Sequence, residues 1–200
     1  NDKNIVKKIK SLITVHNKNI IEIGPGLGVL TDEILKLNPK KLILIEKDNK
    51  LYEYLIEKYK NTKIIIINDD AMHYDYRKKY KYKIISNLPY NISSKFIFKI
   101  LKTSKSNVTE IICMIQSELA NKFDYSKEKI NKYKFLSKYC SDYKIQFKVS
   151  PSVFYPKPKV NSNVVKFIIK KNDINLEKFD YFLKYFFINK KKKIKSNKYF

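Results

Sequence analysis

Apolar runs alternate along this chain with segments in which apolar residues recur at helical spacing. The runs predict strands at residues 19–23, 42–45, 64–67, 83–86 and 108–115, and the first segment between them predicts a helix at 29–37. This alternation is typical of βαβ units. We therefore predict an α/β fold built around one sheet.

Two of these elements carry more specific expectations. Asp48 can cap a helix, and the apolar residues after it at helical spacing should share one buried face; they are Tyr52, Leu55, Ile56 and Tyr59. The run at 64–67 is wholly β-branched, as expected of a strand that is buried on both of its faces.

The second half of the chain continues the pattern. Ser93 or Ser94 is expected to cap a helix that buries Phe96, Ile97, Ile100 and Leu101. The remaining elements of this half are helices at 116–123 and 131–141, strands at 144–149 and 163–170, and a Pro-rich loop at 151–158. From Leu176 the spacing becomes helical, so we place a boundary near residue 172. It separates a domain of residues 1–172 from the beginning of a helical domain at 173–200.

The net charge of the chain is compatible with a nucleic-acid partner but does not establish one. The formal net charge of +24 favours a polyanionic partner. Arg77 is the only Arg, however, and Lys, Asn, Ile and Tyr are all abundant, as an AT-rich genome would encode. Part of the charge is therefore explained by codon drift on solvated faces, and nucleic-acid binding is permitted rather than established.

Other compositional features exclude several classes of protein. No apolar run approaches the ~20 residues of a membrane span, so we expect no membrane association. Cys113 lies in an apolar run and is expected to be a buried thiol, which fits a reducing compartment. His16 and His73 are too distant in sequence to suggest a metal site.

The glycines are concentrated in one loop. Average composition puts about fourteen glycines in a chain of this length, yet this chain has three, which are Gly24, Gly26 and Gly28. They lie between the first predicted strand and the first predicted helix. Glycines at such a place permit a tight turn and let the backbone approach a ligand closely.

Acidic residues end the next two predicted strands. Glu46 follows the second strand and Asp70 the third. Ligands of an open parallel sheet lie beyond the carboxyl ends of its strands, where Glu46 can accept both hydroxyls of a ribose and Asp70 the amino group of an adenine. The pattern predicts an adenosine-binding site. No Lys-Ser/Thr pair follows the glycines, which disfavours a P-loop nucleotidase, and a nicotinamide enzyme would leave the next motif unexplained.

That motif is Asn87-Leu88-Pro89-Tyr90, at the end of the fourth predicted strand. An arylamine nitrogen is a poor nucleophile because its lone pair is delocalised into the ring. The Asn87 side-chain oxygen and the Leu88 carbonyl can accept its two hydrogens and favour a pyramidal nitrogen. Pro89 fixes the turn, and Tyr90 can stack on a base that has left its helix.

These motifs together resemble the ribosomal RNA adenine dimethyltransferase family. The matching segments are residues 22–31, Glu46, 70–72, 87–93 and 151–162. The sequences Asn-Leu-Pro-Tyr-Asn-Ile-Ser at 87–93 and Pro-Ser-Val-Phe-Tyr-Pro-Lys-Pro-Lys-Val-Asn-Ser at 151–162 are especially similar to the bacterial type. Residues 179–198 resemble the start of the family's small helical domain, so the resemblance covers nearly the whole chain.

The resemblance implies a Rossmann-like, seven-stranded sheet of the S-adenosylmethionine-dependent methyltransferase type, with the start of a small C-terminal helical domain. It implies dimethylation of N6 on two adjacent adenines near the 3′ end of small-subunit ribosomal RNA, as a part of ribosome biogenesis. The residues that it assigns to S-adenosylmethionine are Glu22, Gly24, Pro25, Gly26, Glu46, Asp70, Ala71 and Asn87. Those that it assigns to the target adenine are Asn87, Leu88, Pro89, Tyr90 and Phe154, with Phe154 on the face opposite Tyr90.

The chain departs from the family pattern at two places. The family's segment before the first helix closes over the methionine end of the cofactor, and this chain begins after the counterpart of that segment. A Gly that the family would have between Tyr133 and Leu136 is absent, and Lys134 and Phe135 stand there.

Two other functions stay open. A large-subunit ribosomal RNA methylase of the antibiotic-resistance type shares the adenosine site and an Asn-x-Pro-Tyr motif, although the Pro-Ser-x-Phe loop and the helical tail favour the small-subunit enzyme. A non-catalytic nucleic-acid-binding protein, acting in ribosome assembly or organellar transcription, would have lost cofactor residues, and this chain keeps them.

We expect a monomer that binds no metal and acts on ribosomal RNA or the assembling small subunit. Its expected location is a bacterial cytoplasm or the matrix of a mitochondrion or plastid.

Overall fold

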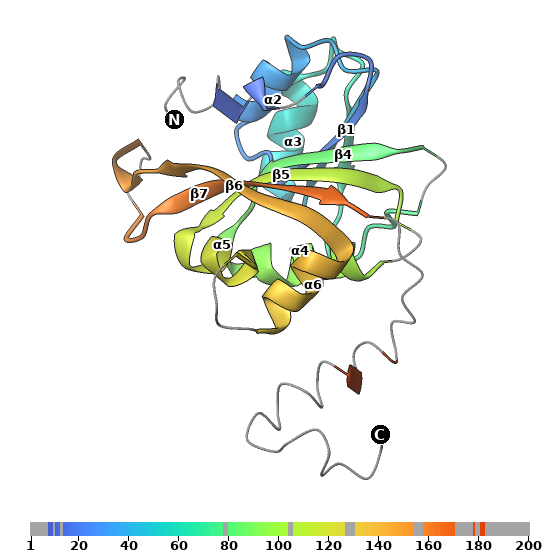
Figure 1. Cartoon of the computed structure of the whole chain (residues 1–200). Coiled ribbons are helices and arrows are strands. Elements are labelled where there is room, and N and C mark those ends of the chain that lie inside the picture. The colour runs from blue at the N-terminus through green and yellow to red at the C-terminus, as the bar shows by residue number, and fades with distance from the viewer. Residues whose placement is uncertain are drawn as a thin grey trace, which may run out of the picture.

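The computed structural model describes residues 8, 9, 11, 12, 14–77, 80–103, 106–126, 131–153, 158–170, 178, 181 and 182. These form a seven-stranded sheet with helices on both faces (Figure 1). The strands are β1 (Asn19–Ile23), β2 (Lys41–Glu46), β3 (Ile65–Asn68), β4 (Tyr82–Asn87), β5 (Val108–Gln116), β6 (Ser141–Val149) and β7 (Ser162–Ile169). The helices are α2 (Val29–Leu35), α3 (Asn49–Lys58), α4 (Tyr90–Lys102), α5 (Ser117–Phe123) and α6 (Lys132–Cys140), with a 3₁₀ turn η1 (Pro151–Val153). Within the part of the chain that is described, none of the helices has the length and apolarity to cross a membrane.

The strand order places a reversal of the chain beside β1. The order across the sheet is β3-β2-β1-β4-β5-β7-β6. The first five of these strands pair in parallel, whereas β7 is antiparallel to both of its neighbours. The chain thus moves outward from β1 to β3 and returns to the other side of β1 as β4. In sheets of this kind the ligand site lies at the carboxyl ends of the strands, where the order reverses.

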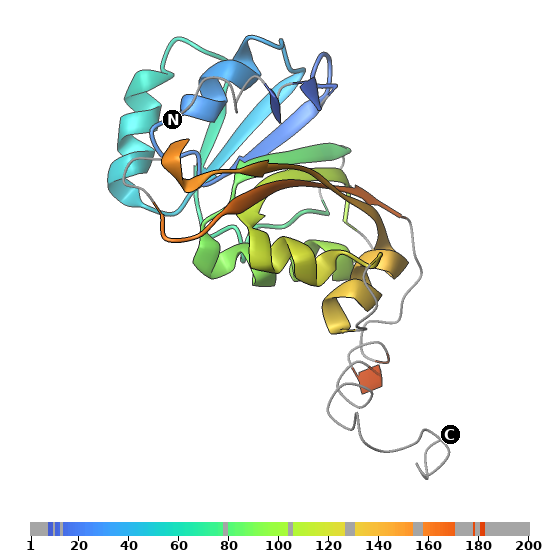
Figure 2. The same cartoon turned by 60° about the vertical axis from the view of Figure 1, so that its left-hand side comes forward.

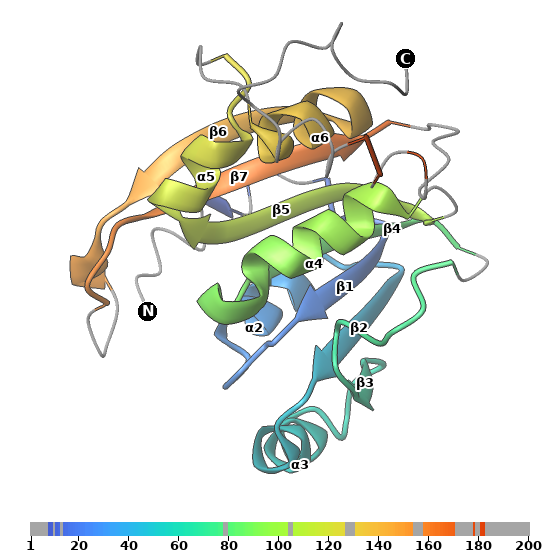
Figure 3. The same ribbon diagram turned by 90° about the horizontal axis from the view of Figure 1, so that it is seen from below.

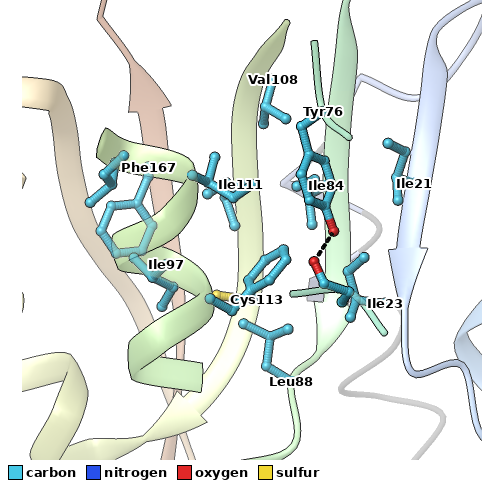
Figure 4. Close-up of a cluster of buried hydrophobic side chains, with 14 of the residues drawn as sticks. Ile21, Ile23, Tyr76, Ile84, Leu88, Ile97, Val108, Ile111, Cys113 and Phe167 are labelled. Carbon is cyan, nitrogen blue, oxygen red and sulfur yellow. Dashed lines mark hydrogen bonds between the residues drawn. The ribbon is translucent and has the colours of Figure 1, made fainter. Parts of the chain in front are cut away.

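Both faces of the sheet are buried because helices cover each of them, and alternate residues of each central strand point to one face or the other. Ile21 and Ile84 pack in the cluster that includes the apolar residues of α4, and Figure 4 shows them together with Ile97 of that helix. Ile20 and Ile85 belong to the opposite cluster, which the helices α2 and α3 cover. Figures 2 and 3 show the same two helical layers from other sides, with α4, α5 and α6 on one face of the sheet. Continuous apolar runs in the strands follow from this double burial.

The predicted α/β architecture is confirmed, and each predicted strand and helix within the described residues is present with bounds close to those expected. Asp48 caps α3 as predicted, since its side chain accepts a hydrogen bond from the amide of Leu51 at 2.9 Å. The expected face of that helix is right for Leu55 and Tyr59, which are buried. It is wrong for Ile56, which is 44% exposed, because α3 covers the sheet with a stripe too narrow to include the position next to Leu55.

Two further expectations are wrong. The strand β3 is not buried on both faces: it is the edge of the sheet, and Ile65 is 39% exposed, because the chain returns to the other side of β1 rather than adding a neighbour to β3. Neither Ser93 nor Ser94 caps α4, which begins at Tyr90 directly after Pro89. The Ser93 hydroxyl lies within the helix and donates to the Pro89 carbonyl at 2.8 Å.

The C-terminal part bears on one prediction only. The domain boundary near residue 172 and nearly all of residues 173–200 lie outside the described residues, so the division into two domains stays a prediction. Phe182 is described, and its ring centroid lies 5.4 Å from that of Phe135 on α6. Phe182 of the predicted helical segment therefore packs against α6 of the sheet domain.

Candidate functional site

The carboxyl ends of β1, β2 and β4 are joined by hydrogen bonds at the reversal. The Gly24 amide, just after β1, donates to the Ile45 carbonyl of β2 at 2.9 Å. The buried Ser86 hydroxyl of β4 donates to the Ile23 carbonyl of β1 at 2.5 Å. The last residues of these three strands and the segments that follow them carry most of the predicted site residues, so the structure gathers these at the carboxyl ends of the strands.

The glycine loop between β1 and α2 has a left-handed backbone that favours glycine. Gly26 has φ 57° and Gly28 has φ 79°, a region that costs other residues about 1–2 kcal/mol. A Cβ added at Gly26 would meet no atom within 4 Å, whereas one at Gly28 would lie 2.3 Å from the Tyr59 hydroxyl oxygen. The loop therefore faces open space at Gly26 and packs closely against α3 at Gly28.

The end of α3 supports this loop. The Tyr59 hydroxyl donates to Asp32 Oδ1 at 2.6 Å and lies 3.0 Å from the Gly28 carbonyl oxygen. Lys58 Nζ donates to the Leu27 carbonyl and to Asp32 Oδ2, both at 2.9 Å. Burial, together with the hydrogen bond to Asp32, raises the pKa of the Tyr59 phenol. The phenol is thus a stable donor, and α2, α3 and the glycine loop form one unit.

Glu22 lies beneath the loop rather than beside open space. Its side chain is 2% exposed, and Oε2 accepts a hydrogen bond from Thr31 at 2.7 Å. Burial raises the pKa of Glu22 to about 8, against a smaller opposing effect of the Thr31 hydrogen bond. Such a carboxyl supports the turn from below, and little of it is available to a ligand.

Glu46 is tied to the loop from the end of β2. Its Oε2 accepts from the Gly26 amide at 3.4 Å, and its Oε1 accepts from the Asp48 amide at 3.0 Å. A carboxylate has about four acceptor positions, so each oxygen keeps capacity for one further donor. Glu46 is therefore oriented beside the open face of Gly26 with acceptors to spare.

Asp70 lies beyond the edge strand β3, in a turn that follows it. Its Oδ1 accepts from the Met72 amide at 2.8 Å and its Oδ2 accepts from Lys47 Nζ at 2.8 Å. The hydrogen bond from Lys47, followed by that from Met72, holds the pKa of Asp70 below its usual value. Asp70 is consequently an ionised acceptor near neutral pH. Like Glu46, it lies at the carboxyl ends of the strands.

The turn after Asp70 is fixed from below by α4. Lys99 Nζ donates to the carbonyls of Met72 and Tyr74, at 2.5 and 3.1 Å. The Tyr76 hydroxyl donates to the Ala71 carbonyl at 3.0 Å, drawn as a dashed line in Figure 4. Ala71 itself is 5% exposed. Ala71 is thus part of the floor of the site, held by hydrogen bonds to its carbonyl and its neighbours.

The segment from Asn87 to Tyr90 leaves β4 beside the glycine loop. Asn87 is exposed, Leu88 is buried, and Pro89 precedes the first residue of α4. A Cβ added at Gly24 would lie 3.5 Å from Pro89 Cγ, so the loop and this segment lie side by side with no room for a larger side chain between them. The Leu88 carbonyl has only a 3.4 Å contact with the Ser93 hydroxyl and retains acceptor capacity. The two acceptors predicted for an amino group thus stand next to the predicted adenosine site.

Some predicted residues do not enter this arrangement. Phe154 lies outside the described residues, so its stacking role stays a prediction. Cys113 is buried as expected, and burial raises the pKa of its thiol. Among the residues that the structure describes, no group of three or more His, Cys, Asp or Glu side chains could hold a metal ion.

The sequence did not predict which residues hydrogen-bond to the backbone of the glycine loop and of the turn after Asp70. Tyr59 and Lys58 act on the glycine loop from 31 residues away, and Lys99 acts on the turn after Asp70 from 27 residues away. No local spacing connects such pairs. For Lys47 a signal existed, because it directly follows Glu46 at the end of a strand.

Comparison with known proteins finds sequence relatives of this chain. The chain matches the family model described as ribosomal RNA adenine dimethylase over residues 1–199. It is 40% identical over 204 residues to ribosomal RNA small subunit methyltransferase A of Malacoplasma penetrans, an alignment that covers 98% of this chain and 73% of the relative.

Solved structures give the same fold. The crystal structure of a dimethyladenosine transferase from Plasmodium falciparum matches with a TM-score of 0.84 and 26% identity, over 98% of this chain and 72% of the other. The 23S rRNA methyltransferase ErmE matches with a TM-score of 0.79 over 94% of this chain and 78% of the other. At 20% identity, the second likeness shows the fold alone.

The contact between Gly28 and Tyr59 generates a first prediction. We expect Gly28→Ala to lower the free energy of unfolding by more than Gly26→Ala does, because both positions have positive φ but only Gly28 meets the Tyr59 hydroxyl. Gly26→Ala should cost about 1–2 kcal/mol from backbone strain, and Gly28→Ala should cost at least about 1 kcal/mol more from the steric clash. Urea unfolding of the two variants measures this difference.

Removing the hydroxyl supplies the control. In a Tyr59→Phe background the excess cost of Gly28→Ala should shrink, because the atom nearest to the added Cβ is gone. Equal costs at Gly26 and Gly28 in the wild-type background would contradict the proposed packing.

The buried Glu22 generates a second prediction. Its pKa is about 8 in the folded chain against 4.5 as the ordinary value, so the folded chain holds a proton that the unfolded chain loses between these pH values. The contribution of Glu22 to stability is complete below 4.5 and is lost as pH rises to about 8. Glu22→Gln keeps a neutral side chain and should flatten this decline in the free energy of unfolding, measured by urea unfolding across the pH range. The matched variant Glu53→Gln, on the exposed side of α3, should keep the wild-type profile, and a profile for Glu22→Gln equal to that of Glu53→Gln would refute the assignment.

Proposed function

Because this chain belongs to the ribosomal RNA adenine dimethylase family, we propose that it transfers methyl groups from S-adenosylmethionine to N6 of adenines in small-subunit ribosomal RNA. The proposed acceptors are two adjacent adenines near the 3′ end. The observation that supports this proposal is the closeness of the glycine loop to the segment Asn87–Tyr90, since a Cβ added at Gly24 would lie 3.5 Å from Pro89 Cγ.

The residues present fit an adenosyl cofactor. Open space at Gly26 lets the group lie against the loop, where a side chain would fill its place. Glu46 has spare acceptor capacity for the ribose hydroxyls, and the ionised Asp70 can accept from the adenine amino group. S-adenosylmethionine, when bound, supplies a methyl group whose bond to sulfur is already activated by positive charge. Pro25 and Ala71 contribute backbone, and Glu22 supports the loop.

The chain's own chemistry is the orientation of the target amino group. The Asn87 side-chain oxygen and the Leu88 carbonyl accept its two hydrogens, so that the nitrogen lone pair points away from them. The Tyr90 ring is 37% exposed and can stack on the base. No strong general base is needed, because the ammonium product can release its proton to water after transfer. Positioning and the exclusion of water therefore carry the reaction.

The net charge of +24 fits an RNA substrate. Lys side chains contact phosphates with little sequence information, which gives affinity and a strong dependence on salt. Specificity for one pair of adenines then has to come from the shape of the assembling ribosomal subunit. The bacterial source of the 40% identical relative favours a bacterial cytoplasm over an organelle matrix as the place of this reaction.

The two alternative functions are less well supported. The relative of Malacoplasma penetrans is named for the small subunit and aligns over 98% of this chain, whereas the likeness to the 23S rRNA methyltransferase ErmE rests on 20% identity. A purely nucleic-acid-binding protein has no need for the spare acceptors of Glu46, nor for the left-handed backbone at Gly26.

The substitution Asn87→Ala tests the proposed reaction. The purified chain is incubated with small ribosomal subunits that lack methyladenines and with methyl-labelled S-adenosylmethionine, and the label is mapped along the RNA. We expect label at paired adenines near the 3′ end, and a fall of about 100-fold or more in its rate for Asn87→Ala, because one preorganised partner of the reacting group is lost. Because the resemblance also assigns Asn87 to the cofactor, the rates are compared at saturating S-adenosylmethionine, and the affinity for S-adenosylhomocysteine is measured separately.

The control is Asn19→Ala, which removes an Asn at the opposite end of the sheet, where its side chain donates to the Lys81 carbonyl. This variant should methylate at the wild-type rate. Label confined to large-subunit RNA would support the resistance-type enzyme instead. Failure both to bind S-adenosylhomocysteine and to transfer a methyl group to any RNA would support the nucleic-acid-binding alternative.

A further inference from the structure

Tyr90 makes a hydrogen bond with Ser162 that has no role in the reaction proposed above. Its hydroxyl lies 2.7 Å from the hydroxyl of Ser162, which is 72 residues farther along the chain. The two ends of this bond differ in their surroundings. Tyr90 is 37% exposed at the proposed target site, whereas Ser162 is fully buried. The bond thus connects a side chain at the surface of the site to a fixed point in the sheet.

Ser162 is fixed because β7 begins there between two strands. It stands opposite Gln116 of β5 and opposite Val149 of β6. The residues on either side of it are held as well: the Ser117 amide donates to the Asn161 carbonyl at 2.9 Å, and the Ser117 hydroxyl donates to the Asn163 side chain. Ser162 therefore has little freedom to follow a movement of Tyr90, and the ring has to conform to the serine.

A tyrosine at the start of a helix has two side-chain torsions, and packing alone leaves a half-exposed ring some freedom in both. A hydrogen bond at the far end of the ring removes much of that freedom, because the phenol oxygen can then occupy only a small region. A stacking surface needs this kind of restriction, since its effect depends on the plane that it offers to the base.

We propose that Ser162 is a positioning residue of the reaction, which holds the Tyr90 ring in the plane where it stacks on the target adenine. The inference rests on the proposed function and goes beyond it by assigning a role to a residue on β7. Ser162 does not touch the base or the cofactor, and it acts only through the Tyr90 hydroxyl.

The competing explanation is that Tyr90 merely satisfies a buried serine hydroxyl. Both explanations allow some loss of stability when the bond is removed, so stability does not separate them. They differ in the chemical step. A positioning role lowers kcat while the KM for the subunits changes little, because misorientation of the base costs most in the transition state. A structural role leaves kcat of the folded enzyme unchanged.

The experiment compares Ser162→Ala, Tyr90→Phe and the double variant in the methylation assay described above. Each single variant removes one hydroxyl of the same bond and keeps the aromatic ring, so each should lower kcat by roughly fivefold to tenfold, as for one hydrogen bond. The double variant should be no slower than either single one, since the bond is lost only once. S-adenosylhomocysteine affinity should equal that of the wild type in all three.

Ser141→Ala is the matched control. Ser141 is also fully buried at the end of a strand, and its hydroxyl donates to the Ser137 carbonyl at 2.8 Å, but it stands opposite Ile169, at the other end of β7. It should methylate with the wild-type kcat. If Ser162→Ala fails to fold, Tyr90→Phe carries the same test alone.

The outcomes are distinct. A lower kcat in both single variants with no further loss in the double variant supports the positioning role. An unchanged kcat in Ser162→Ala or Tyr90→Phe, or effects that multiply in the double variant, overturns it while the proposed function stands. A wild-type chain that transfers no methyl group to any RNA overturns both.

Discussion

The parallel pairing of β1 with β2 on one side and with β4 on the other is the constraint on which the site depends. It brings the carboxyl ends of three strands side by side. The hydrogen bonds from Gly24 to Ile45 and from Ser86 to Ile23 hold those ends together. A shift of one residue in either pairing would turn the side chains of β1 to the opposite face and move the glycine loop away from Asn87. The position of every proposed contact follows from this register.

The site is rigid because a second set of residues supports it from behind. Tyr59 and Lys58 hold the glycine loop, Lys99 holds the turn after Asp70, and Ser162 holds the ring of Tyr90. Lys58 and Tyr59 stand at the end of α3, Lys99 lies in α4, and Ser162 begins β7. A reaction that depends on positioning, with no strong acid or base, needs such support because small displacements of the reacting groups lower the rate steeply.

The sequence reveals the fold and the residues of the site to different degrees. The fold was accessible because both faces of the sheet are buried, so its strands read as apolar runs, and because the glycines of a glycine-poor chain mark one loop. The edge position of β3 was hidden, since Ile64–Ile67 would look the same in a central strand. The start of α4 at Tyr90 was missed because Pro89, which offers no side-chain cap, precedes a helix that also contains two serines. The supporting roles of Ser162 and Tyr59 could not be predicted, because their hydrogen-bond partners are distant in sequence and no local pattern encodes such contacts.

The proposed chemistry depends above all on the glycine loop and the end of β2 forming one adenosine site. Calorimetric titration of S-adenosylhomocysteine into the wild-type chain, Glu46→Gln and Glu53→Gln tests it most directly. We expect one ligand per chain and wild-type affinity for Glu53→Gln, on the exposed side of α3. Glu46→Gln should bind at least about tenfold more weakly, because hydrogen bonds to a charged acceptor contribute about 1.5–3 kcal/mol. Equal affinity in Glu46→Gln and the wild type, or no binding by the wild type, would contradict it.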